Sequence, residues 1–209
     1  MQFLFSPDSK IMQFLGRLYD IAVLNLLFLV TCVPLVTIGA ASTALYSVVF
    51  AMDTDREGGI LSTYFRSFRR NFWQSTVIFL ALALFGGASC MNVLIFSRMS
   101  GGIGVALSGL ALLILLVIAQ TSAMVFPLVS QFQNTTMAMV KNAFLLSLAN
   151  LPRAMLAAVV NGIPMLLVLL SPYLFLQLGG LWMFLYFGAT AYFLSRVLKK
   201  VFDPLIPQE

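Results

Sequence analysis

The chain has 209 residues, of which 61% are hydrophobic and only 9% are charged, and its formal net charge is +5. A water-soluble domain typically carries about 25% charged residues, so this composition excludes a soluble globular protein and predicts an α-helical membrane protein. His is absent and Cys32 and Cys90 are the only cysteines. This excludes a structural zinc site, which takes about four Cys or His ligands. We expect one integral membrane domain over residues 1–209. In such a protein, the excess of positive charge indicates which side of the membrane the loops occupy, and it does not indicate nucleic-acid binding.

Long apolar runs predict membrane spans, because a helix of about 20 apolar residues crosses the hydrocarbon core. Five runs are long enough, at residues 11–35, 72–97, 102–132, 153–178 and 180–198. A sixth candidate, residues 39–52, is short. With a rise of about 1.5 Å per residue it extends for roughly 21 Å, against a hydrocarbon core of about 30 Å.

The distribution of Lys and Arg favours a crossing by residues 39–52. If this segment crosses, only Arg98 lies on one side, and the other side holds Lys10, Arg17, Arg56, Arg66, Arg69, Arg70, Lys141, Arg153, Arg196, Lys199 and Lys200. If it does not cross, Lys10 and Arg17 move to the far side. The basic residues on the two sides then number nine and three instead of eleven and one. Because Lys and Arg of short loops stay cytoplasmic, we expect six crossings in three hairpins, with both ends in the cytoplasm.

The stretch CVPLVTIGAASTALY, residues 32–46, is then the outer turn of a tight helical hairpin. Pro34 interrupts the helix there, and small or hydroxylated residues follow it: Thr37, Gly39, Ala40, Ser42, Thr43 and Ala44. Hydroxyls can satisfy the backbone groups that a proline frees, and small residues let another helix approach closely. We expect ordinary close packing at this hairpin, and a substrate path through it is the alternative.

Two segments between the spans predict amphipathic helices at the cytoplasmic leaflet. Residues 60–71 place apolar side chains at helical spacing, whereas Arg66, Arg69 and Arg70 project elsewhere and are expected to contact lipid phosphate. Residues 135–150 also have an apolar side, and Asn134 or Thr135 is a candidate N-cap. Membrane lipids are therefore expected partners of this chain.

The stretch DTDREGGI, residues 53–60, is similar to the start of a calcium-binding loop. Asp53, Asp55 and Glu57 stand at alternate positions, as carboxylate ligands do in such a loop. The twelfth position of the loop must supply a bidentate Glu, and here it is Tyr64. We therefore interpret the stretch as a solvated turn whose acids pair with nearby arginines, and we expect no metal.

Six polar residues are expected at membrane depth: Asp20, Asn25, Asn92, Gln120, Asn161 and Gln177. The neutral amides can line a polar cavity for a hydroxylated solute, or they can form hydrogen bonds between helices. Asp20 can pair with Arg17, one helical turn away, or serve in transport. Because GxSxG, Walker A and HExxH motifs and Cys–His pairs are absent from the sequence, we expect neither an enzyme nor a cofactor.

Two motifs, PLVTIGAASTALY at residues 34–46 and FRSFRRNFWQST at residues 65–76, resemble the YesL family of bacterial membrane proteins, a domain of unknown function. KNAFLLSLANLPR at residues 141–153 also resembles that family's pattern, and the length and the layout of the spans agree, so the resemblance covers nearly the whole chain. It implies a multi-pass protein of the bacterial cytoplasmic membrane without known catalytic or ligand residues. Family members often accompany genes for sugar-uptake ABC transporters, which implies an accessory role in carbohydrate import with an ABC permease as partner.

Two functions therefore remain open. The first is an accessory or carrier component in oligosaccharide uptake, which the resemblance and the neutral polar groups at membrane depth favour. The second is a membrane scaffold or regulator without a translocation path, which the basic aromatic segments and the lack of a deep ion pair favour. A homo-oligomer is compatible with either function.

Overall fold

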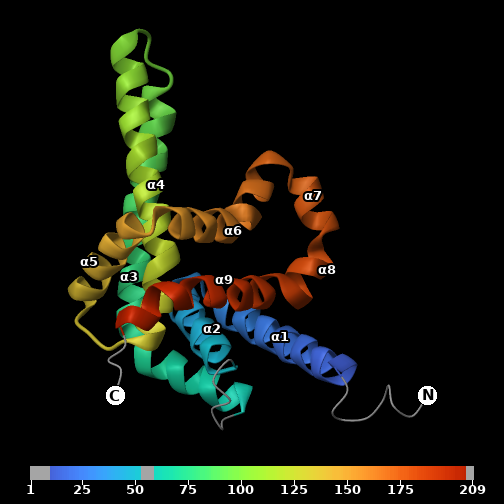
Figure 1. Ribbon diagram of the computed structural model, residues 1–209. Coiled ribbons are helices and arrows are strands. Elements are labelled where there is room, and N and C mark those ends of the chain that lie inside the picture. Colours follow the sequence, from blue (N-terminus) through green and yellow to red (C-terminus); the bar gives the residue numbers. More distant parts are fainter. Residues whose placement is uncertain (1–9, 53–58, 206–209) are drawn as a thin grey trace.

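The computed structural model describes residues 10–52 and 59–205, and every regular element in these two ranges is helical. Six helices there are long and apolar enough to span a membrane: Ile11–Cys32, Leu35–Met52, Ile60–Phe96, Gly102–Gln131, Leu151–Leu170 and Gly179–Leu205. The expected all-α architecture with six candidate spans is therefore confirmed. Figure 1 shows that the helices are not all parallel, since α6 and α9 run across the direction of α3 and α4.

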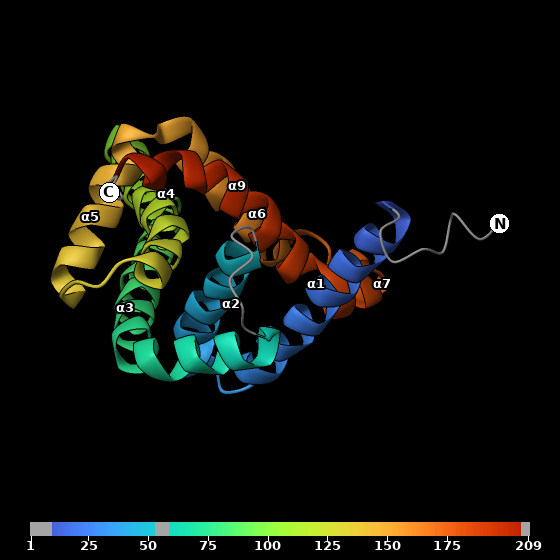
Figure 2. The ribbon, with the colours of Figure 1, turned by 60° about the horizontal axis from the view of Figure 1, so that its bottom comes forward.

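The predicted N-terminal hairpin is confirmed. Helix α1 (Lys10–Cys32) ends just before Pro34, and a short 3₁₀ turn leads into α2 (Ile38–Met52). The hydroxyl of Thr37 donates hydrogen bonds to the carbonyls of Thr31 and Pro34, which are among the backbone groups freed at this turn. At the opposite end, the guanidinium of Arg17 donates to the Met52 carbonyl over 3.0 Å. Figure 2 shows that α1 and α2 diverge from their turn, so the long Arg17 side chain bridges α1 and the end of α2.

Helix α2 packs closely against α3 (Ile60–Phe96) through small and hydroxylated residues. Thr43 Oγ1 lies 2.8 Å from Ser75 Oγ, and Ser47 Oγ lies 2.6 Å from Ser67 Oγ. A Cβ atom added at Gly39 would lie only 2.2 Å from the Ser75 carbonyl oxygen. The predicted close approach of another helix is therefore confirmed at Gly39, and Ala40 and Ala44 are also fully buried.

Helices α3 and α4 (Gly102–Gln131) form a long antiparallel hairpin whose far half projects from the rest of the molecule (Figure 1). The sequence predicts a break between an interfacial helix at residues 60–71 and a span at residues 72–97, but the structure has one continuous helix. No Gly or Pro occurs between residues 60 and 85, so nothing in this sequence ends the helix. Figure 1 shows instead that the first turns of α3 cross the base of the molecule before the helix rises beside α4.

The predicted helix at residues 135–150 is confirmed as α5 (Thr136–Ala149), and Thr135 Oγ1 accepts a hydrogen bond from the Ala138 amide. Helix α6 (Leu151–Leu170) follows directly and corresponds to the predicted span at residues 153–178. That span is too long by eight residues, because the helix ends before Ser171 and Pro172. Proline has no backbone N–H for the preceding turn and clashes with its carbonyl.

Two short helices, α7 (Pro172–Gln177) and α8 (Gly179–Leu181), join α6 to the last span (Figure 1). A π-helical turn, Trp182–Tyr186, then leads into α9 (Phe187–Phe202). The core lies where α1, α2, α4 and α9 meet, and its fully buried side chains include Leu24, Val49, Met124 and Leu198.

Candidate functional site

Asn25 cross-links α1 to the last span, and its polar atoms are not directed into a cavity. Its Nδ2 donates to the carbonyls of Trp182, at 2.9 Å, and Met183, at 2.7 Å, and its Oδ1 accepts from the Gly188 amide at 3.0 Å. A π-helical turn shifts the usual backbone pairing and leaves carbonyls and amides to find other partners. Asn25 supplies those partners and is fully buried, so its role is structural.

Four other polar residues predicted at membrane depth lie apart from one another. Asp20 is half-buried on α1, and Arg17, its expected partner, bonds to the Met52 carbonyl. Gln120 is buried within α4, whereas Asn92 is exposed on the projecting part of α3 and Gln177 is exposed at the end of α7. The structure does not bring these side chains into one cavity, because α7 turns away from the core and the α3–α4 hairpin extends beyond it.

Asn161 is the exception, because it lines a pocket of about 320 Å³ among α1, α2, α4, α6 and α9. We call this cavity the Tyr46 pocket, and its polar lining residues are Ser42, Tyr46, Ser122, Asn161 and Thr190. Every residue that lines it is uncharged, and the rest of its wall is apolar and aromatic. This composition is typical of small-molecule sites, which are mostly apolar with a few placed polar groups.

The hydroxyl of Tyr46 is the most informative group in this pocket. Tyr46 is only 5% exposed, and its hydroxyl oxygen has no hydrogen-bond partner among the residues that the structure describes. The Asn161 side chain is a polar neighbour of this hydroxyl, although the two groups do not form a hydrogen bond of normal geometry. Buried hydroxyls are normally hydrogen-bonded, so an unpaired hydroxyl at the wall of a pocket is unusual. The sequence pattern does not single out Tyr46, since an aromatic residue in an apolar run is usually core.

Two further hydroxyls leave the pocket able to accept hydrogen bonds. Ser122 Oγ donates to the Ala119 carbonyl at 2.8 Å, and Thr190 Oγ1 donates to the Phe187 carbonyl at 3.1 Å. A hydroxyl that donates its proton keeps lone pairs that can accept. The pocket thus offers donors and acceptors without charge, which suits a neutral hydroxylated molecule.

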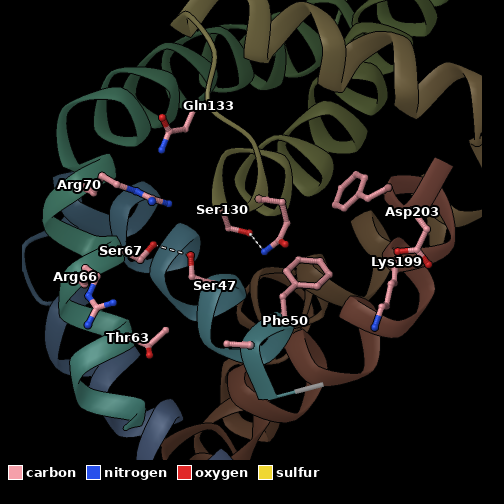
Figure 3. A pocket seen from close by; sticks show the side chains of 13 residues that line it. Ser47, Phe50, Thr63, Arg66, Ser67, Arg70, Ser130, Gln133, Lys199 and Asp203 are labelled. Atoms are coloured by element: carbon pink, nitrogen blue, oxygen red, sulfur yellow. Dashed lines mark hydrogen bonds between the residues drawn. The ribbon is translucent and has the colours of Figure 1, made fainter. Parts of the chain in front are cut away.

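A second pocket, of about 440 Å³, lies at the end of the molecule where α2, α4 and α9 terminate (Figure 3). We call it the basic basin, because its charged lining residues within the described ranges are Arg66 and Arg70 of α3, Lys199 of α9 and one carboxylate, Asp203. Figure 3 shows the two arginines on one wall and Lys199 with Asp203 on the opposite wall. Arg69 does not line the basin, so the three arginines predicted to contact lipid phosphate fall into two groups.

The described part of the chain contains no candidate metal site. No group of three or more His, Cys, Asp or Glu side chains lies close enough to hold a metal ion within residues 10–52 and 59–205. Cys32 and Cys90 are both free thiols. The calcium-like stretch at residues 53–60 lies almost wholly outside the described residues.

Part of the chain is similar to a known family. Residues 21–93 match the family model described as "Protein of unknown function, DUF624". The match covers about a third of the chain, from α1 to the far end of α3, and includes both motifs at residues 34–46 and 65–76. The DUF624 match thus contains Tyr46, Arg66 and Arg70, whereas Asn161 and Lys199 lie beyond it. No curated protein and no solved structure matches the chain.

Proposed function

We propose that the protein is an accessory or carrier component in oligosaccharide uptake across a bacterial cytoplasmic membrane, and that the Tyr46 pocket contacts the sugar. The observation that carries the proposal is that Tyr46 lines this pocket and that its buried hydroxyl has no hydrogen bond of normal geometry to a described residue. Leaving a buried hydroxyl unpaired costs about 1–3 kcal/mol. Phe would fill the same space without that cost, so a ligand that pairs with the hydroxyl accounts for Tyr at this position.

The chemistry of the pocket matches that of a carbohydrate. A sugar has many hydroxyls and no charge, and the pocket has neutral donors and acceptors and no charged lining residue. Phe28, Phe126 and Phe187 add aromatic surface, against which the apolar face of a sugar ring can pack. The volume of about 320 Å³ is near the lower end of the roughly 300–1,000 Å³ of small-molecule sites, so the pocket accommodates a small ligand or one end of an oligosaccharide.

Uptake measurements test the proposed function. A strain that lacks the protein should take up at least one labelled oligosaccharide more slowly, and the wild-type gene should restore the rate. The gene for Tyr46→Phe should restore an uptake rate about tenfold lower than the wild-type gene does, because one ligand hydrogen bond contributes on the order of 1.4 kcal/mol. Tyr173→Phe is the matched control, since Tyr173 is exposed on α7 and outside the pocket. Unchanged uptake of every oligosaccharide in the deletion strain would exclude the proposal.

The same substitution separates ligand binding from folding. Without ligand, Tyr46→Phe should raise the free energy of unfolding by about 1 kcal/mol, because it removes an unpaired buried hydroxyl. For a chain of this size the melting temperature should rise by roughly 2–4 °C, measured in a detergent without a sugar headgroup. Tyr186→Phe should lower the melting temperature, since it removes the hydrogen bond that the Tyr186 hydroxyl donates to the Val160 carbonyl at 2.5 Å. Destabilisation by Tyr46→Phe would mean that its hydroxyl is already paired within the fold.

A scaffold or regulatory role is the second candidate, and the projecting α3–α4 hairpin favours it. Leu84, Phe85, Ile103 and Val105 on this hairpin are each more than 60% exposed, so the surface is available to lipid or to another membrane protein. Helices associate in lipid through packing of such surfaces rather than through the hydrophobic effect. Co-purification in a mild detergent distinguishes the two functions. An ABC permease that co-purifies supports the uptake role, whereas a homo-oligomer alone supports the scaffold role.

A further inference from the structure

The basic basin has the charge and the shape of a phosphate site. We propose that Arg66 and Arg70 bind a phosphate group there, carried either by a water-soluble phosphate compound or by an anionic lipid headgroup. This inference is independent of the proposed uptake function, because the basin and the Tyr46 pocket share no lining residue.

The two arginines lie one helical turn apart on the same face of α3, and both line the basin. Like charges four residues apart destabilise an isolated helix by a few tenths of a kcal/mol, and a bound anion removes that repulsion. With Lys199 opposite and Asp203 as the lining carboxylate, the described lining residues carry three positive charges and one negative charge, a net charge of +2. Guanidinium groups bind phosphate oxygens through paired hydrogen bonds, which makes arginine the preferred residue for such sites.

Helix capping does not account for these arginines. Helices α2, α4 and α9 all end at the basin, and basic side chains often neutralise the carbonyls at helix C-termini. However, Arg17 binds the last carbonyl of α2, and the end of α4 is closed by its own backbone, with the Phe132 amide donating to Leu128. The one hydrogen bond from Arg66 to another described residue goes to Ser62 Oγ, at 3.3 Å. Among the described residues, nothing else occupies these guanidiniums, which leaves them available to an anion.

Neutral hydrogen-bonding groups complete the basin. Thr63, Gln131 and Gln133 line it, together with the paired hydroxyls of Ser47 and Ser67 (Figure 3). Its volume of about 440 Å³ is within the range of small-molecule sites and exceeds what one inorganic phosphate needs, so the phosphate belongs to a larger molecule. The basin opens at the end of the molecule where the basic residues predict the cytoplasm, which both soluble phosphates and lipid headgroups can reach.

Binding of pyrophosphate to the full-length protein tests the site. Titration calorimetry in a neutral detergent should detect pyrophosphate binding to the wild type, and R66Q/R70Q should raise the Kd at least about tenfold. Arg69→Gln is the matched control, since Arg69 neighbours both residues but does not line the basin, and its Kd should stay within about twofold of wild type. Because a double substitution can also disturb α3, Lys199→Gln on α9 gives a second test, with an expected increase in Kd of about threefold or more.

A lipid arm of the experiment identifies the source of the phosphate. Native mass spectrometry should count phosphatidylglycerol retained by the wild type and by R66Q/R70Q, with phosphatidylcholine as the neutral reference. Retention that the double variant loses and that pyrophosphate displaces indicates a lipid headgroup, and pyrophosphate binding without such retention indicates a soluble ligand. The proposal is overturned if the wild type binds neither probe, or if Arg69→Gln weakens binding as much as R66Q/R70Q.

Discussion

Replacing Gly39 by Ala is expected to lower the free energy of unfolding by about 2–3 kcal/mol, because the added methyl group has no space. Its Cβ would lie 2.2 Å from the Ser75 carbonyl oxygen and 2.7 Å from Phe79 Cβ. Both are parts of α3 that cannot rotate away, so α2 and α3 must separate. Separation would also lengthen the hydrogen bond between Thr43 and Ser75, which is 2.8 Å in the native contact.

Thermal unfolding in detergent measures this effect, with Gly87→Ala as the control. At about 2–4 °C per kcal/mol, the melting temperature of Gly39→Ala should fall by roughly 4–12 °C. Gly87 lies on α3, and no atom lies within 4 Å of a Cβ added there. Its substitution by Ala should therefore be neutral or slightly stabilising. Equal melting temperatures for the two variants would contradict the close approach of α2 and α3.

Replacing Asn25 by Leu is expected to cost about 2–4 kcal/mol of folding stability, the second largest effect. Leucine has a similar volume but leaves the Trp182 and Met183 carbonyls and the Gly188 amide without their Asn25 partner. Each buried group that loses its partner costs about 1–3 kcal/mol, and partial relaxation of the π-helical turn reduces the sum. The approach of α1 to α9 is also tight, since a Cβ at Gly188 would lie 2.6 Å from the Ile21 carbonyl oxygen.

Asn92→Leu is the matched control for this substitution. Asn92 is exposed on the projecting part of α3, so the same chemical change should leave the melting temperature within about 2 °C of wild type. Asn25→Leu should lower it by roughly 4–16 °C. If both substitutions had the same small effect, the cross-link between α1 and the last span would not be a stabilising element.

Much of the fold follows from the sequence, because lipid exposure leaves long apolar runs that are easy to recognise. The α1–α2 hairpin follows from Pro34 and from the distribution of basic residues, and α5 follows from its cap at Thr135. The continuity of α3 and the early end of α6 at Ser171 were not predicted. The continuity of α3 depends on the absence of helix breakers, and the end of α6 depends on Pro172. A search for apolar runs does not take these local signals into account.

The candidate sites were much harder to predict. Asn161 was expected in a polar cavity and lines a mostly apolar pocket, which Tyr46 lines only because α2, α4, α6 and α9 meet there. The basic basin likewise joins Arg66 with Lys199, which are 133 positions apart in the sequence. A pocket formed by several helices depends on tertiary packing, and no spacing within one helix reports it. Only the small residues around Gly39 had a local pattern that predicted their contact.

Cysteine labelling most directly tests the claim on which both sites depend, that α2 returns to the side on which α1 begins. Single cysteines would replace Ser9, Gly59 and Ser100 in a variant without the native thiols of Cys32 and Cys90. With an impermeant maleimide, we expect Ser9→Cys and Gly59→Cys to react only after permeabilisation, and Ser100→Cys to react in intact cells. Reaction of Ser9→Cys and Gly59→Cys from opposite sides of the membrane would contradict the hairpin and the orientation of both pockets.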